Sequence, residues 1–325
     1  MRHPFAQGIR SALLPAAAAA LAGCGGGSSS GGSGTGSLSV GITDGPVDSA
    51  DAVVVEFSGV TLKPADGEPI GIDFTDGLGN PSPKQWDLLA LDGDASELLL
   101  EDETVPAGAY DWIRLHVNAP GADDPATPER EGSYIVVDGG APQPLDIPSG
   151  ARTGLKLVSG FTVPAGGELA VTVDFDLRRS VVEAPPGSYK LKPALRIVDD
   201  DDTGHLAGTI TANYVTNRCP GGDTNGLAVY VFAGGDVTPD DIDGIDPDPV
   251  ATDTAELDPA TNDYDYGIGF LEAGTYTAAV TCNAKDDVVP GNGSGDPVDN
   301  DIGLMDAVNV DIEAGTTTTR DFQVP

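Results

Sequence analysis

The segment Leu169–Leu177 carries the strictest hydrophobic alternation in the chain. Apolar side chains stand at every second position, and from Val171 onward the polar residues Thr172, Asp174 and Asp176 stand between them. A period of two residues is typical of a β-strand with one buried face. Similar short segments recur with no long amphipathic helix between them, and 44 Gly and 26 Pro favour turns. The pattern predicts an all-β fold of antiparallel β-sandwiches with Greek-key connections of the immunoglobulin or transthyretin-like type.

The strand-like segments fall into two groups on either side of Asp199–Gly204, which begins with four adjacent carboxylates. Because four such groups repel one another, we expect residues 199–204 to form an exposed acidic linker, with calcium binding as the alternative. One β-sandwich domain is expected at residues 37–198 and a second at residues 205–325. Ser96–Glu101 is expected to form one helical turn. The predicted strands are Leu38–Ile42, Val53–Phe57, Trp86–Leu91, Trp112–Val117, Tyr134–Val137, Leu155–Val158, Leu169–Leu177, Tyr189–Val198, Leu206–Tyr214, Leu227–Phe232, Tyr264–Phe270, Thr275–Cys282, Ala307–Ile312 and Thr316–Val324.

Residues 1–23 have the pattern of an export signal. Arg2 and Arg10 give a positively charged start, and an Ala/Leu-rich run from Ser11 to Leu21 follows. That run is too short to span a bilayer as a permanent helix. Ordinary secretion, with cleavage among Ala16–Ala20, is one interpretation of this segment.

The next residues favour a lipid anchor instead. Leu21-Ala22-Gly23-Cys24 resembles the lipobox of bacterial lipoproteins, in which the cysteine is acylated and becomes the new N-terminus. The resemblance implies cleavage between Gly23 and Cys24, with membrane lipid as the partner of the acylated Cys24. Gly25 stands where lipoproteins of the inner membrane carry Asp, so the resemblance implies a lipid-anchored envelope protein, in the outer membrane if the cell has one. Residues 24–36 are then a lipidated Gly/Ser tether with a mean reach of roughly 20 Å.

The formal net charge of −36 comes from 52 acidic and 16 basic residues. A surface this acidic repels nucleic acid and anionic lipid, so both are excluded as partners. Phosphate loops, dinucleotide fingerprints and the zinc motif H-E-x-x-H are absent. His116 and His205, in different predicted domains, leave little material for a Ser-His-Asp triad. We therefore expect no enzymatic activity and no cofactor, with calcium as the alternative, and we expect His116 at the surface or at a strand edge.

Three cysteines are present: Cys24, Cys219 and Cys282. If Cys24 carries lipid, an even pair remains in an exported chain, which favours a disulfide between Cys219 and Cys282. Closing a loop of about 60 residues would stabilise the fold by about 4 kcal/mol at most in the chain-entropy model. Two buried free thiols are the alternative.

Aspartates supply the remaining candidates for ligand binding. The loop Asp236–Asp253 fails as an EF-hand, because Pro239 and Val250 would occupy ligand positions. An irregular calcium site remains open there, although a disordered acidic loop is the favoured interpretation. The candidate metal ligands of this loop are Asp240, Asp241, Asp243 and Asp246.

Asp174 and Asp176 lie two positions apart on one predicted strand face, near enough for joint metal binding or acid/base chemistry. Arg178 continues that face, and a cross-strand charge ladder is the favoured interpretation. Asp44 lies within Thr43–Pro46. An Asx-type turn is the favoured interpretation for this residue, and a ligand-binding role is the alternative. The lysines expected on nearby strands of the ladder are Lys156, Lys190 and Lys192.

Several motifs share their order with one family. They are Leu38–Asp48, Trp86–Leu91, Pro106–Tyr110, Ile113–Leu115, Ile147–Gly150, Thr153–Leu157, Asp174–Asp176 and Lys192-Pro193. Through them the segment 37–198 resembles DUF4382, an uncharacterised family of bacterial lipoprotein domains with no assigned activity. The C-terminal part resembles, more loosely, the transthyretin-like (carboxypeptidase-regulatory-like) sandwiches.

These features together predict a non-enzymatic cell-envelope lipoprotein. It would display two β-sandwich domains for structural or adhesive interactions with an envelope protein or polysaccharide partner. A surface module that binds calcium or a polysaccharide is the alternative.

Overall fold

The computed structural model describes residues 34–45, 50–91, 93–119, 132–148, 150–183, 187–192, 194–222, 224, 226–287 and 301–324. The predicted export signal, Gly23, Cys24 and most of the predicted tether lie outside these residues. The described residues belong to one compact unit. None of their helices combines the length and the apolar character that a membrane span requires.

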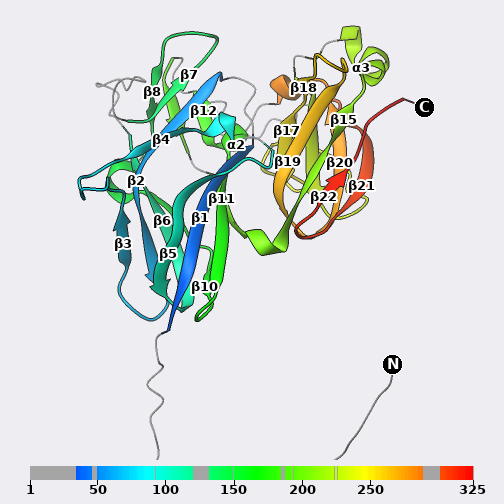
Figure 1. Cartoon of the computed structure of the whole chain (residues 1–325). Coiled ribbons are helices and arrows are strands. Elements are labelled where there is room, and N and C mark those ends of the chain that lie inside the picture. The colour runs from blue at the N-terminus through cyan, green and yellow to red at the C-terminus, as the bar shows by residue number, and fades with distance from the viewer. Residues whose placement is uncertain are drawn as a thin grey trace, which may run out of the picture. The chain divides into compact units, whose positions relative to one another are not determined.

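The chain before residue 200 forms two β-sheets that share one hydrophobic core (Figure 1). Its elements are β1 (Thr35–Gly45), β2 (Ala52–Pro64), β3 (Ile70–Asp73), β4 (Lys84–Asp87), η1 (Leu88–Ala90), β5 (Glu97–Pro106), β6 (Gly108–Asn118), β7 (Tyr134–Val136), β8 (Gln143–Asp146), α1 (Gly150–Thr153), β9 (Leu155–Leu157), β10 (Phe161–Val163), β11 (Glu168–Asp176), α2 (Leu177–Ser180), β12 (Val181–Glu183), β13 (Tyr189–Leu191) and β14 (Leu195–Asp199). The smaller sheet has the strand order β14-β11-β1-β5. The larger sheet has the order β10-β6-β2-β7-β8-β13-β12, with β3 and β4 also paired to β2, and β9 paired to β6. Side chains such as Leu38, Val55 and Phe175 are fully buried between the sheets, which is where the alternating pattern placed them.

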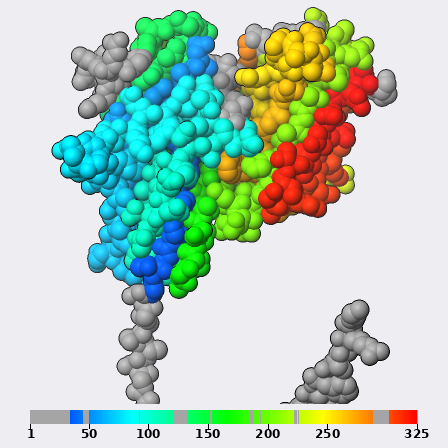
Figure 2. All heavy atoms as spheres, viewed as in Figure 1, coloured from blue at the N-terminus to red at the C-terminus, as the bar shows by residue number. Residues whose placement is uncertain are grey.

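The chain after residue 199 forms a second pair of four-stranded sheets, with the orders β18-β19-β15-β22 and β17-β16-β20-β21. The elements of this part are η2 (Asp200–Asp202), β15 (Thr203–Ile210), α3 (Ala212–Arg218), η3 (Pro220–Gly222), β16 (Ala228–Ala233), β17 (Ala251–Thr254), β18 (Glu256–Leu257), β19 (Tyr264–Glu272), β20 (Gly274–Thr281), η4 (Ala284–Asp286), β21 (Met305–Ile312) and β22 (Thr317–Thr319). The last strands and the chain end run along the outside of this part, in red in Figure 2. Its core is built around Leu206, Tyr214 and Val229.

The predicted all-β fold is confirmed. Most neighbouring strands run antiparallel, but β1 runs parallel to β11, β8 to β13 and β15 to β22. Three of the four described sheets are therefore mixed, and the sheet β17-β16-β20-β21 is antiparallel throughout. The parallel pair of β1 and β11 is central to the smaller N-terminal sheet, and it brings two distant stretches of sequence into register: Thr43 pairs with Asp174, and Gly45 pairs with Asp176.

A disulfide joins Cys219 and Cys282 across a sequence separation of 63 residues. Cys219 follows α3 and Cys282 follows β20, and both sulfurs lie in the core of the second pair of sheets. The disulfide predicted from the cysteine count is confirmed.

Two local expectations need revision. Ser96–Glu101 is not a helical turn, because residues from Glu97 onward form β5. Pairing of β5 with β1 and burial of Leu99 and Leu100 override the local sequence. The acidic stretch after β14 is exposed at Asp201 and Asp202 but half-buried at Asp199 and Asp200, and burial raises the pKa of Asp200.

Candidate functional site

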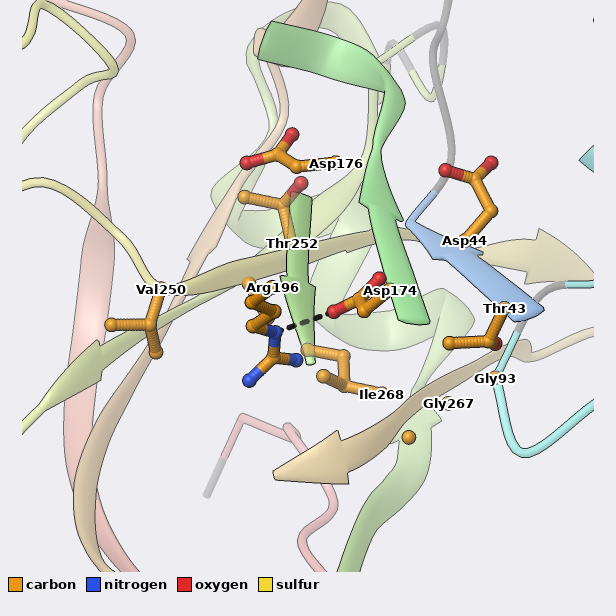
Figure 3. A pocket seen from close by; sticks show the side chains of 12 residues that line it. Thr43, Asp44, Gly93, Asp174, Asp176, Arg196, Val250, Thr252, Gly267 and Ile268 are labelled. Atoms are coloured by element: carbon orange, nitrogen blue, oxygen red, sulfur yellow. Dashed lines mark hydrogen bonds and ion pairs between the residues drawn. The ribbon is translucent and has the colours of Figure 1, made fainter. Parts of the chain in front are cut away.

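Asp44, Asp174 and Asp176 line a common pocket (Figure 3). Asp44 comes from β1, and the other two come from the neighbouring strand β11. Thr43, Gly93 and Arg196 complete this side of the pocket, and Val250–Thr252 and Gly267–Gly269 of the second pair of sheets form the opposite wall. The pocket therefore lies at the junction between the two pairs of sheets, a surface that we call the junction.

The cavity at the junction measures only about 30 Å³. A water molecule needs roughly 10–15 Å³ of such space, so the cavity fits one or two waters. Organic ligands occupy pockets of roughly 300–1,000 Å³. The junction pocket is thus far too small for a sugar, a nucleotide or a peptide side chain.

Asp174 is committed to an ion pair. Its Oδ2 atom accepts a hydrogen bond from Nε of Arg196 at 2.6 Å, and the two residues occupy paired positions on β11 and β14. A cross-strand pair of this kind is what a charge ladder predicts, but its cation is Arg196. Lys190 instead lies 3.9 Å from the carboxylate of Asp146, and Lys156 lies over the ring of Trp112.

Asp176 ends β11 and starts the short helix α2. Its Oδ1 atom accepts a hydrogen bond from the backbone N–H of Arg179 at 3.1 Å, and its Oδ2 atom lies 3.3 Å from Nε of Arg179. Burial raises the pKa of this carboxyl, while the Arg179 charge and hydrogen bond lower it. Because the strand stops here, the expectation that Arg178 continues the strand face is wrong.

Asp44 is 5% exposed, and its Oδ1 atom accepts a hydrogen bond from the backbone N–H of Leu177 at 3.3 Å. The carboxylate therefore reaches across to the start of α2. Thr43 is buried beside it, with its Oγ1 atom 3.0 Å from the carbonyl of Leu91 and 2.7 Å from that of Ala95. Both side chains tie separate segments of backbone together.

Two adjacent arginines that the sequence patterns did not single out as a pair reach across the junction. The Nη1 atom of Arg178 donates to the carbonyl of Ala284 at 3.0 Å, and its guanidinium lies 5.5 Å from the ring centroid of Tyr230. The Nη2 atom of Arg179 donates to the carbonyl of Pro249 at 2.9 Å and lies 3.0 Å from a carboxylate oxygen of Asp248. The signal available in the sequence was a pair of arginines directly after a strongly patterned strand.

The sequence favoured disorder for the acidic loop 236–253. The loop is ordered in the structure, so that interpretation is wrong. Asp241 and Asp243 are 1% and 6% exposed, and Asp243 accepts a hydrogen bond from the backbone N–H of Ile245 at 2.8 Å. Asp248 accepts from the N–H of Gly244 at 3.1 Å and faces Arg179. Hydrogen bonds to backbone N–H groups and one cation stabilise these charges.

Asp240 and Asp246, the other two calcium candidates of this loop, have separate surroundings in the structure. Asp240 accepts a hydrogen bond from the N–H of Asp241, and Asp246 precedes a cis proline. Within the residues that the structure describes, no group of three or more His, Cys, Asp or Glu side chains is arranged to hold a metal ion. His116 is half-buried, with its Nε2 atom 2.7 Å from Oγ1 of Thr61.

Residues 35–193 match the family model described as "Domain of unknown function (DUF4382)", which confirms the family resemblance seen in the sequence motifs. No curated protein matches the chain.

Three solved structures are distantly similar. The Bacillus anthracis TIE protein is 11% identical, with 88% of this chain and 34% of that chain covered and a TM-score of 0.19. GBS52, the minor pilin of Streptococcus agalactiae, is 12% identical, with 89% and 97% covered and a TM-score of 0.18. A fimbrial protein from Bacteroides ovatus is 8% identical, with 89% and 49% covered and a TM-score of 0.18. This chain thus spans about a third of the length of the first, and nothing about its function follows from similarities this weak.

Proposed function

We propose that the chain is a non-enzymatic lipoprotein of the cell envelope that presents two linked pairs of β-sheets for structural or adhesive interactions. One observation carries the proposal. The carboxylates that were the best candidates for chemistry are bound to backbone N–H groups and arginines that hold the junction together, around a cavity of about 30 Å³. Side chains used in this way stabilise a scaffold, and at the junction they leave no room for a substrate.

The disulfide supports the export part of the proposal. Disulfides form and persist in oxidising compartments and are rare in the cytosol. The lipobox resemblance then assigns the anchor to Cys24, with cleavage after Gly23 and outer-membrane placement where the cell has such a membrane. Stable anchoring by acyl chains requires more than one chain per protein.

The anchor is tested by the variant Cys24→Ser in the full-length chain. Wild-type protein should sediment with membranes and be released only by detergent, whereas Cys24→Ser should appear in the soluble fraction or remain an uncleaved precursor. Ser28→Ala, four residues further on, is the matched control and should sediment like the wild type. Sedimentation of Cys24→Ser as a cleaved mature chain to the same extent as the wild type, or an unmodified thiol at Cys24 by mass spectrometry of the native protein, would contradict the proposal.

A further inference from the structure

The outward face of the larger N-terminal sheet carries a group of cations around an indole ring. We call this the Trp112 face; it consists of Lys63, Trp112, Arg114 and Lys156 on β2, β6 and β9. The guanidinium carbon of Arg114 lies 4.9 Å from the Trp112 ring centroid, and the ammonium of Lys156 lies 4.6 Å from it. The alternate residues of β6, Ile113 and Leu115, are fully buried, which turns Trp112 and Arg114 away from the core.

Arg114 and Lys156 occupy directly paired positions on β6 and β9. Like charges placed opposite each other across a sheet are destabilising. The chain has 52 acidic and only 16 basic residues, so its composition does not favour a direct pair of two basic residues. Lys63, which pairs with Trp112, adds a third cation on the other side of β6, so the arrangement concentrates positive charge around one aromatic ring.

These cations are not neutralised within the described part of the chain. The ion pairs recorded there involve Arg179, Lys190, Arg196 and Arg218, and none involves a cation of the Trp112 face. The ammonium of Lys63 donates to the carbonyls of Pro64 and Gly67, which leaves its charge unopposed by a carboxylate. The Nε atom of Arg114 is buried and donates to no described acceptor. An anion bound beside Trp112 would supply the negative charge that the Trp112 face lacks.

The geometry points to one class of ligand. The guanidinium carbon of Arg114 and the ammonium of Lys156 lie 4.9 and 4.6 Å from the centre of the Trp112 ring, so carboxylates on a sugar chain that packs against the indole would lie near both cations. The partly exposed indole adds a flat apolar surface against which a sugar ring packs. We propose that the Trp112 face binds an acidic polysaccharide, one that carries carboxylates on its sugar rings; this rests on the adhesive form of the proposed function.

The net charge of −36 opposes binding of a polyanion to the surface as a whole, but a local group of cations is affected mainly by the charges close to it. At physiological ionic strength the Debye length is about 8 Å, so carboxylates farther from the Trp112 face are largely screened while contacts within it persist.

The test measures binding of the full-length protein in detergent to polygalacturonate at physiological ionic strength. Dextran of matched length is the neutral comparison, and glycerophosphoglycerol, the soluble headgroup of phosphatidylglycerol, is the anionic lipid comparison. The variants are Trp112→Ala, Arg114→Gln and Lys156→Gln. Lys285→Gln is the matched control, because it removes one exposed lysine from η4, in the second pair of sheets. The melting temperature of each variant shows whether it folds.

We expect polygalacturonate to bind and dextran not to bind. The side chain of Lys156 is exposed, so Lys156→Gln should not disturb the fold. This variant should weaken binding at least about fivefold, the equivalent of ~1 kcal/mol, whereas Lys285→Gln should leave binding unchanged. Equal loss in Lys156→Gln and Lys285→Gln, equal binding of dextran, or binding to the soluble lipid headgroup alone would each overturn the proposal. Those outcomes leave membrane sedimentation through Cys24 untouched, so the two proposals fail separately.

Discussion

At the scale of single residues, the carboxyl of Asp176 shows how burial and a neighbouring cation compete. Burial is the larger influence and raises its pKa above the ordinary value of 3.8, while Arg179 acts in the opposite direction. The folded protein therefore holds a proton on Asp176 more tightly than the unfolded chain does. Protonation of this group stabilises the fold, and that contribution is lost as the pH rises through the raised pKa.

The variant Asp176→Asn should remove this contribution while keeping a good helix-capping side chain for α2. The unfolding free energy of the wild type relative to the variant should increase as the pH is lowered from about 7 to about 4, the range above the ordinary carboxyl pKa. Urea unfolding at a series of pH values measures it. Asp66→Asn, an exposed position after β2, is the control for loss of one carboxylate. A difference that stays flat or falls toward low pH would contradict the assignment.

At the scale of secondary-structure elements, β19 touches the N-terminal part through its backbone. Ile268 forms a parallel bridge with Gly93, and a Cβ atom added at Gly269 would collide with the carbonyl oxygen of Gly93. At Gly267, two positions earlier on the same strand, an added Cβ would meet the Cα of Gly93 at 3.6 Å, an ordinary contact. One position thus requires glycine for close approach, and the other does not.

Gly269→Ala should therefore force the two pairs of sheets apart and lower the free energy of unfolding by about 2 kcal/mol, as overpacking of a close contact does. Gly267→Ala should change it by less than about 0.5 kcal/mol, the usual range for a tolerated substitution. Chemical denaturation of the two variants side by side gives the comparison. Equal effects would mean that the contact with Gly93 does not hold the sheets together.

The disulfide connects α3 to the end of β20 and closes a loop of 63 residues. Replacing both Cys219 and Cys282 by alanine frees that loop in the unfolded chain and should lower stability by about 4 kcal/mol. Thermal unfolding with and without reductant should reproduce the same loss for the wild type and no further loss for the double variant. A reductant effect that persists in the double variant would assign the loss to another cause.

Much of the strand pattern could be predicted from the sequence, because half-buried strands show a period of two. Val171, Val173 and Phe175 are buried as the alternation required. The single segment predicted for residues 189–198 is divided into β13, which ends at Leu191, and β14, which begins at Leu195, and the sequence between them contains a proline, a residue without an N–H to donate to a ladder. The segment predicted as strand to Tyr214 turns into α3, which Thr211 caps by accepting from the N–H of Tyr214.

The candidate site was harder to predict from the sequence than the strands were. Asp174 and Asp176 stood out through their spacing, but their closeness to Asp44 depends on the parallel register of β1 and β11, which no local pattern encodes. The roles of Arg178 and Arg179 depend on contacts with residues near 249 and 284, far away in sequence. Long-range pairing decides which side chains meet, whereas periodicity reports only which face each one occupies.

At the scale of the whole molecule, Arg178 couples the two pairs of sheets. Its side chain is 6% exposed, donates to the carbonyl of Ala284 and lies over Tyr230. Both tryptophans, Trp86 and Trp112, belong to the N-terminal part, so their fluorescence reports on that part alone, whereas circular dichroism reports on all strands.

In the wild type the fluorescence and circular dichroism curves should coincide on urea unfolding, because the junction makes the two parts unfold together. Arg178→Met keeps the apolar stem but removes the charged hydrogen bond, and it should separate the two curves and lower stability by about 2 kcal/mol. Arg218→Met, which breaks an exposed ion pair with Asp306, is the control and should shift neither curve by more than about 1 kcal/mol. Separate transitions in the wild type would show that the junction does not couple the parts.

The position of β1 has a mechanical consequence. It is the first strand after the proposed tether and lies inside its sheet, hydrogen-bonded to β5 on one side and to β11 on the other. Tension transmitted from a membrane anchor would pull along the axis of this strand, across its hydrogen bonds to β5 and β11, and would load both ladders in shear at once. A protein anchored through such a central strand resists unfolding under tension, because many hydrogen bonds must break together. In a protein anchored through an edge strand, the hydrogen bonds could break one after another.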